Sequence, residues 1–301
     1  MRHGVMILPE HPWPRAREVW TAAERLGFDH AWTYDHLMWR WFSDRPWYAT
    51  MPTLTAAAAV TSRIRLGMLV ASPNFRHPVN FAKELVTLDD VSAGRLVCGV
   101  GAGAEGFDSR IRGDRPLTAR ERGARFAEFT ELLDRLLRDP QTTFHGDFYT
   151  ALEVRTEPGC VQSPRIPLAV AAAGPRGMAL AARLADTWVT TGAPNLFELQ
   201  PYAQVLPVVK DQMAEVDRAC EAVGRDPATL RRLLVTDVSV GGVLESAETY
   251  RDAAGLYGEL GITDLVVHWP RPDFPYQGRV EVLEEVAETV LGGGPAAEET
   301  K

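Results

Sequence analysis

Residues 64–101 read IRLGMLVASPNFRHPVNFAKELVTLDDVSAGRLVCGVG, and they contain two short apolar runs that flank a longer stretch. The two runs, residues 64–71 and 96–101, have the length and composition of strands. Between them, Pro78 suits the first turn of a helix and Gly94 suits its end. The segment therefore predicts a strand, a helix and a second strand, which is the repeating unit of a parallel sheet.

The same alternation continues along the chain. We expect eight strands, at residues 4–9, 31–34, 64–71, 96–101, 167–172, 187–191, 233–240 and 264–269. The stretches between them have the apolar spacing of helices that pack on a sheet, for example at Phe126, Phe129, Leu133 and Leu136. We therefore predict an α/β fold, a (β/α)8 TIM barrel that forms a single domain with loop insertions over residues 1–291. Residues 292–301 are expected to be a disordered tail.

Composition and charge exclude several classes of protein. The 301 residues are 46% hydrophobic and 24% charged, as in ordinary globular proteins. A net charge of -8 offers no basic surface for nucleic acid, and no apolar run reaches the roughly 18 residues that a membrane span needs. The three cysteines form no C-x-x-C motif, so neither disulfides nor a zinc site is expected. We expect a cytoplasmic protein whose partners are small molecules.

The end of the second predicted strand carries the candidate catalytic groups. Residues 32–36 read WTYDH and place Asp35 and His36 at the carboxyl end of the strand, where barrel enzymes keep their catalytic residues. A histidine near its ordinary pKa can give or take a proton, and a neighbouring aspartate can orient it or hydrogen-bond a cofactor ring. Such pairs are also often structural. The aromatic loop that follows, residues 37–50, favours the functional interpretation.

Aromatic and histidine side chains gather at the same predicted rim. The candidates for substrate contact are Trp39, Trp41, Trp47, His11, His268 and Trp269. The three tryptophans of the loop suggest an apolar or aromatic ligand, or else a hydrophobic cover for the rim. Each of the other three residues, taken alone, is more typical of packing than of catalysis. The histidines form no H-x-H or H-x-x-x-H motif, so a metal site is not expected.

Two glycine-rich segments are candidates for cofactor contact. Glycines at alternate positions 99, 101 and 103 would let a planar ring or a phosphate approach the backbone, or would permit tight packing. Residues 173–177, AGPRG, lead into a helix whose open N–H groups, together with Arg176, suit an anion. The candidate cofactor-binding residues in these segments are Gly101, Ala102, Gly103, Ala173, Gly174, Pro175, Arg176 and Gly177.

Over about residues 5–287 the chain resembles the superfamily of luciferase-like flavin-dependent monooxygenases and F420-dependent oxidoreductases. The resemblance lies in motifs that occur in the same order along the chain, at residues 32–36, 62–67, 75–78 with 82–84, 87–89 with 92–95, 99–103, and 173–177 with 185–187. Residues 87–89 and 92–95 are interpreted as architectural, with Asp89 and Arg95 holding the barrel together.

The resemblance implies a barrel with coenzyme F420 or FMN lying across its C-terminal end, and a homodimer that associates through outer helices. It places His36 near the cofactor ring as a proton donor or acceptor. It also implies a bulge with a non-proline cis peptide near Leu69 and Val70, so that Leu69, Val70 and Ala71 join the expected cofactor-binding residues.

Three functions follow from the resemblance. The preferred one is hydride transfer between F420 and a small organic substrate, the second is FMN-dependent monooxygenation, and the third is a cofactor-binding barrel without catalysis. Sugar-phosphate dehydrogenases of the F420 branch carry a glutamate directly after the glycines of the fourth strand. This chain has Ala104 there and only then Glu105, which argues against a sugar-phosphate substrate.

Overall fold

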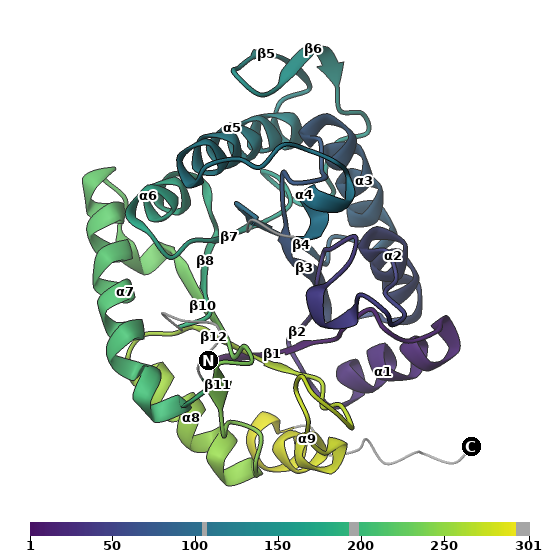
Figure 1. Ribbon diagram of the computed structural model, residues 1–301, viewed down its shortest axis with the longest axis vertical. Coiled ribbons are helices and arrows are strands. Elements are labelled where there is room, and N and C mark those ends of the chain that lie inside the picture. Colours follow the sequence, from purple (N-terminus) through teal and green to yellow (C-terminus); the bar gives the residue numbers. More distant parts are fainter. Residues whose placement is uncertain (104–106, 193–198, 293–301) are drawn as a thin grey trace.

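The computed structural model describes residues 1–103, 107–192 and 199–292. Eight parallel strands close into a barrel in the order β1-β12-β10-β8-β7-β4-β3-β2, with helices around them (Figure 1). The barrel strands are β1 (Arg2–Met6), β2 (His30–Thr33), β3 (Arg65–Ala71), β4 (Leu96–Gly101), β7 (Leu168–Ala171), β8 (Thr187–Thr190), β10 (Arg231–Val235) and β12 (Asp264–His268). Each lies within or overlaps one of the eight expected runs, which confirms the predicted (β/α)8 TIM barrel.

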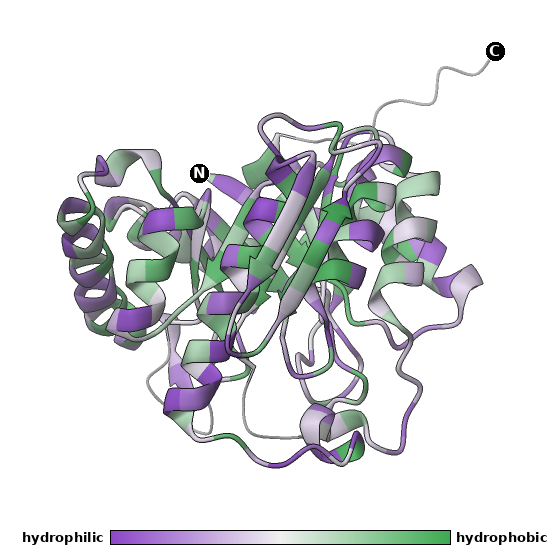
Figure 2. Ribbon diagram, turned by 90° about the horizontal axis from the view of Figure 1, so that it is seen from above, coloured by the Kyte–Doolittle hydropathy of each residue, from purple (hydrophilic) through white to green (hydrophobic). Residues whose placement is uncertain are grey.

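Helices connect successive barrel strands and cover the outside of the barrel. They are α1 (Trp13–Arg25), α2 (Thr50–Val60), α3 (Pro78–Val91), α5 (Ala119–Arg138), α6 (Pro175–Leu184), α7 (Tyr202–Ala222), α8 (Ala247–Glu259) and α9 (Val280–Val286). Pro78 is the first residue of α3, and the expected apolar residues of α5 are all buried. Figure 2 shows hydrophilic residues on the outward sides of the helices and mainly hydrophobic strands between them. No described helix is long and apolar enough to cross a membrane.

Successive strand residues point alternately into the barrel and out toward the helices. In β1, Met6 belongs to the inner apolar cluster and Val5 to the outer one. In β12, Val266 points inward while Leu265 packs outward. Because both sides are buried, the strands read as continuous apolar runs, and their positions are recognisable from the sequence.

The sequence prediction was wrong at residues 236–240. The strand expected over residues 233–240 ends at Val235, and a turn follows in which Val238 N–H is bonded to the Asp237 carboxylate and Val240 N–H to the Asp237 carbonyl. Beyond it, β11 (Val240–Gly241) pairs with β9 (Gln200–Pro201) outside the barrel. Residues 235–240 are mostly β-branched, so in the sequence they resemble the continuation of a strand. Asp237, whose side chain and carbonyl close the turn, is the one signal against a strand.

A hairpin lies outside the barrel between α5 and β7, where no strand was predicted. Antiparallel strands β5 (Gln141–His145) and β6 (Thr150–Arg155) project beyond α5 (Figure 1). The turn between them is held by Glu128 of α5, whose carboxylate accepts hydrogen bonds from three consecutive backbone N–H groups, at residues 147–149. In β5 the alternately buried side chains include Thr142, which is polar, and β6 does not alternate regularly, so no apolar period marks these strands in the sequence.

Candidate active site

The C-terminal mouth, formed by the carboxyl ends of the barrel strands and the loops after them, is lined with aromatic side chains. Trp39 is 8% exposed, and its ring stacks on Phe42 with a centroid separation of 5.5 Å. Trp41 and Trp47 contact Trp39 at centroid separations of 4.7 and 5.6 Å. Tyr276, from the loop after β12, lies parallel to Trp39 at 6.3 Å. The structure therefore brings the three loop tryptophans together as one cluster.

His36 pairs with a carboxylate that the sequence analysis did not identify. Its Nδ1 lies 2.7 Å from an oxygen of Asp108, in the short helix α4 (Phe107–Ile111). The other Asp108 oxygen accepts the backbone N–H of Leu37 at 2.8 Å, and Trp47 donates its indole N–H to the His36 carbonyl at 2.9 Å. The His36 side chain is 36% exposed and that of Asp108 is 7% exposed. The imidazole is thus held through Nδ1, which leaves Nε2 to face a ligand.

We had expected Asp35 to orient His36, but the Asp35 carboxylate is bonded to Arg76 instead. It is 2% exposed, and its two oxygens accept hydrogen bonds from Arg76 Nη2 and Nε at 2.7 and 3.0 Å. Consecutive residues at the end of β2 point to opposite sides, so Asp35 faces the α3 side while His36 faces the mouth. Asp35 accordingly fixes the loop before α3 by a bidentate ion pair and does not orient the histidine.

A chain of hydrogen bonds crosses the mouth beside this pair. His268 Nε2 lies 2.8 Å from the Tyr34 hydroxyl, which lies 2.8 Å from the Tyr276 hydroxyl. Tyr276 donates to Asp237 at 2.7 Å, and its ring stacks on His268 with centroids 3.4 Å apart. Burial lowers the pKa of His268 to about 3, so its imidazole is neutral. This histidine lies at the mouth, as predicted, within a fixed polar network.

Two other candidates take different positions. His11 lies partly exposed in the loop after β1. Trp269 is buried in the outer core, and it borders a cavity between α1 and α9 together with Val19 and Val280. The side chain of Trp269 therefore packs against helices and does not join the aromatic cluster of the mouth.

The predicted bulge in β3 is present. The peptide bond between Leu69 and Val70 is cis, and the pairing of β3 with β4 shifts register between Met68 and Ala71. This confirms the non-proline cis peptide that the family resemblance implies.

The alternate glycines of β4 lie against this part of β3. A Cβ on Gly99 would collide with the backbone oxygen of Met68, and one on Gly101 would lie 2.5 Å from Val70 Cγ2. Gly103 has a φ of 71°, and a Cβ there would lie 2.5 Å from Asn74 Nδ2. Tight packing thus accounts for these glycines. Ala102, between two of them, is partly buried against the outer core.

The start of α6 is open, as the AGPRG segment predicted. Gly174 is the N-cap residue, no side chain caps the helix, and a Cβ on Gly174 would meet no atom within 4 Å. Ala173, Pro175 and Arg176 are exposed. At Gly177, in contrast, a Cβ would lie 2.8 Å from that of Ala172. The first N–H groups of α6 are therefore available to an anion, with a cationic side chain beside them.

The fold and this mouth define a TIM-barrel protein with a His–Asp pair, an aromatic cluster and an open helix start at the end where such barrels carry their active sites. Residues 1–286 match the model of the luciferase-like monooxygenase family, and the chain belongs to that family. Within the described residues, no group of three or more His, Cys, Asp or Glu side chains is arranged to hold a metal ion.

Similar proteins include several that are named for coenzyme F420. The F420-dependent glucose-6-phosphate dehydrogenase of Beutenbergia cavernae is 30% identical over 338 residues, covering 97% of this chain and 96% of that protein. The F420-dependent hydroxymycolic acid dehydrogenase of Mycobacterium tuberculosis is 29% identical over 241 residues, covering 78% of this chain and 62% of that protein. An F420-dependent secondary alcohol dehydrogenase, solved with an F420-acetone adduct, has the same fold, with a TM-score of 0.79. Its sequence is 18% identical, and the superposition covers 97% of this chain and 99% of that chain.

Proposed function

We propose that this protein is an F420-dependent oxidoreductase that transfers hydride between the cofactor and a small organic substrate. The observation that carries the proposal is the whole-length similarity to an F420-dependent dehydrogenase. It is supported by His36 at the C-terminal mouth, whose Nδ1 is hydrogen-bonded to Asp108. When bound, F420 supplies the hydride acceptor or donor, and the barrel supplies binding, orientation and exclusion of water.

The residues at the mouth fit such a cofactor. The β3 bulge at Leu69, Val70 and Ala71 would support the ring, and the open start of α6 would bind the phosphate through its N–H groups and Arg176. An anion is favoured there because the positive end of the helix dipole is exposed and no side chain competes for the N–H groups.

His36 would act as the proton donor or acceptor for the substrate. Asp108 holds Nδ1 at 2.7 Å, fixes the tautomer with the proton on that nitrogen, and stabilises the imidazolium that forms when Nε2 takes a proton. The Trp47 hydrogen bond to the His36 carbonyl fixes the backbone at the same point. The pair can therefore move one proton at Nε2 without rearrangement of the loop.

The surroundings of His36 favour a substrate with an apolar or aromatic part. Trp39, Trp41 and Trp47 form one wall, and the described mouth contributes His268 as a neutral group. Ala104 and Glu105, which argue against a sugar phosphate, lie outside the described residues.

The test of the cofactor is a binding titration of the purified protein with F420 and, separately, with FMN, followed by absorbance and fluorescence. Tight saturable binding of F420 and weak binding of FMN is the expected result. Preference for FMN would replace the proposal with luciferase-like monooxygenation. Absence of binding to either cofactor would favour a barrel without this chemistry.

The site of the cofactor phosphate is tested by Gly174→Asp. Aspartate is a favourable N-cap residue and there is space for its side chain, so the fold is expected to be retained. Its charge would repel the phosphate, and the dissociation constant for F420 is expected to rise about tenfold. Gly255→Asp, at an exposed position of α8 where a Cβ meets no atom within 4 Å, is the matched control. Equal affinities of the two variants would exclude this phosphate site.

We also propose that the protein is cytoplasmic and forms a homodimer through its outer helices, as the family resemblance implies. The three cysteines are free, which fits a reducing compartment. Light scattering after size-exclusion chromatography should give twice the mass of one chain, and a monomer over the whole concentration range would contradict the homodimer.

A further inference from the structure

A cavity opens at the end of the barrel opposite the C-terminal mouth. We call this end the N-terminal mouth, because it is ringed by the first residues of the barrel strands. The cavity has a volume of about 280 Å³, and its lining includes the first residues of six strands, Arg2, His30, Arg65, Thr187, Arg231 and Asp264. None of the described residues assigned above to the cofactor or the substrate lines it.

One aspartate of the lining is fully engaged. Asp264 Oδ1 lies 2.5 Å from Arg2 Nη2 and 3.0 Å from His30 Nε2. Although burial opposes it, these hydrogen bonds hold the pKa of Asp264 well below its usual range. The Trp32 indole, which can only donate, bonds to His30 Nδ1 at 2.6 Å, so that nitrogen carries no proton. His30 is therefore neutral, and Arg2 and Asp264 cancel in charge.

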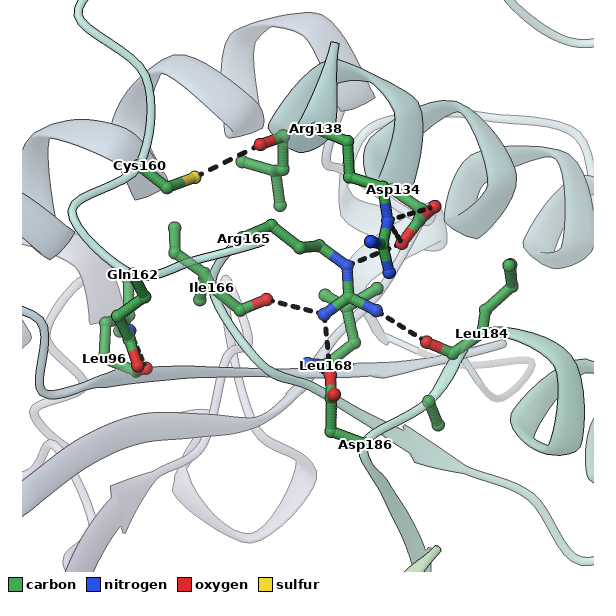
Figure 3. Close-up of polar contacts among 12 residues, drawn as sticks. Leu96, Asp134, Arg138, Cys160, Gln162, Arg165, Ile166, Leu168, Leu184 and Asp186 are labelled. Carbon is green, nitrogen blue, oxygen red and sulfur yellow. Dashed lines mark hydrogen bonds and ion pairs between the residues drawn. The ribbon is translucent and has the colours of Figure 1, made fainter. Parts of the chain in front are cut away.

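The second aspartate of the lining belongs to a separate ionic network (Figure 3). Asp186 Oδ2 accepts from Arg165 Nη1 at 2.6 Å, and Arg165 Nε donates to Asp134 at 2.5 Å. Arg138 donates to the same Asp134 carboxylate at 3.0 Å. The two carboxylates and two guanidinium groups of this network also cancel in charge.

Two cations of the lining remain without an ion-pair partner among the described residues, Arg65 and Arg231. Arg65 Nη2 donates to the neutral Gln162 amide at 2.8 Å, and Gln162 is itself fixed by bonds to Asp89 and to the Leu96 carbonyl. Burial and, next, the charges of Arg231 and Arg2 lower the pKa of Arg65, while the more weakly felt charge of Asp89 opposes them, so the three cations are close enough to repel one another. The Arg65 guanidinium, fixed by Gln162, and the Arg231 guanidinium, which forms no ion pair among the described residues, thus line the same cavity.

We propose that the N-terminal mouth binds a small phosphate-bearing anion, held by Arg65 and Arg231 with Thr187 beside them. A guanidinium binds phosphate oxygens through two parallel hydrogen bonds, and a phosphate group carries a charge of about −1.5 to −2 at neutral pH. This charge matches the two arginines of the lining that form no ion pair among the described residues. The site is independent of the cofactor site, which lies at the other end of the barrel.

The experiment is calorimetric titration of the full-length protein with inorganic phosphate and with glycerol phosphate, in chloride buffer of matched ionic strength. Saturable binding is expected, and the stronger of the two probes shows whether free phosphate or a phosphate ester is preferred. The variant Arg65→Gln/Arg231→Gln should bind at least about tenfold more weakly, since each lost charged hydrogen bond is worth that much or more. Arg231→Gln alone, at an exposed side chain, serves as the variant least disruptive to the fold.

Two further variants distinguish this site from general charge effects. Arg17→Gln/Arg218→Gln removes the same charge from exposed positions on α1 and α7 and should bind phosphate as the wild type does. Arg176→Gln, which alters only the phosphate site proposed at the start of α6, should still show saturable phosphate binding at the N-terminal mouth. Equal weakening in the control double variant, loss of binding in Arg176→Gln, or no binding beyond that of chloride would each overturn the proposal.

Discussion

The two mouths of the barrel are built from the same strands but differ in how their polar groups are used. At the C-terminal mouth, His36 is held at one nitrogen and is 36% exposed, among aromatic rings. Near the N-terminal mouth, Arg165 is 3% exposed, and its nitrogens bond to Asp134, Asp186 and two backbone carbonyls. One end leaves a reactive group accessible, whereas at the other end the charged groups other than Arg65 and Arg231 are mostly paired within the protein.

Arginines at the N-terminal mouth also complete the ends of helices. Arg95 donates to the carbonyls of Ala58, in the last turn of α2, and of Thr61 and Ile64 just beyond it. Arg225 donates to the carbonyls of Ala182, in the last turn of α6, and of Ala185 just beyond it. Carbonyls at helix ends lack partners within the helix and favour cations. These hydrogen bonds agree with the architectural interpretation of Arg95 and show that arginines at the N-terminal mouth stabilise the ends of α2 and α6.

The largest expected effect is on stability, from Arg165→Leu. Loss of this buried guanidinium leaves Asp134 with Arg138 as its remaining partner and removes the donor to two backbone carbonyls, so the free energy of unfolding should fall by about 3–5 kcal/mol. Urea denaturation measures it. Arg183→Leu, which breaks an exposed pair with Glu131, should cost about 1 kcal/mol or less. Similar losses in both variants would mean that the N-terminal network is no more important than a surface pair.

At the opposite mouth, His36→Ala should reduce turnover about a hundredfold or more, which is the usual scale for a lost acid–base group. Because the side chain is one-third exposed, unfolding and F420 affinity should hardly change. Steady-state kinetics with an identified substrate measures the effect, and His145→Ala, on the outer hairpin, is the control. Wild-type turnover in the His36 variant would remove this histidine from the mechanism and make His11 or His268 the next candidates.

The packing beneath the C-terminal mouth is tested by Gly99→Ala. The added methyl group would collide with the backbone of β3 at Met68, and such overpacking costs about 1–3 kcal/mol. Chemical denaturation of this variant should be compared with that of Gly255→Ala, an exposed helical site that ought to gain about 0.5–1 kcal/mol. If Gly99→Ala is as stable as the wild type, packing does not explain the alternate glycines and direct cofactor contact becomes the better explanation.

The smallest effect concerns the pH dependence of His268. Because burial depresses its pKa to about 3 in the folded state, the unfolded state binds more protons below the ordinary value of 6.5. The stability that the neutral ring contributes is complete above pH 6.5 and is lost as the pH falls toward the folded pKa. Between pH 6.5 and 5.5 this amounts to about 1 kcal/mol. His268→Gln should flatten the stability profile by that amount, and an unchanged slope would show that another group titrates there.

The sequence predicted most of the fold correctly but fewer of the contacts within the candidate site. The eight strands and the face of α5 follow from apolar periods that a few consecutive residues define. The bulge at Leu69 and Val70 came from the family resemblance. The aspartate expected to orient His36 was the wrong one, since Asp35 is bonded to Arg76 and Asp108 takes its place. Nothing near Asp108 in the sequence marks it as the partner.

By itself, therefore, the sequence determined which segments become strands and helices, and which strand ends carry chemically useful residues. Tertiary structure alone decided the partners: His36 with Asp108 across 72 positions, Asp35 with Arg76 across 41, and Arg65 and Arg231 around one cavity. The physical reason is that backbone conformation depends on near neighbours and their apolar spacing. Which side chains meet depends on closure of the barrel, which brings together strands that are distant in the chain.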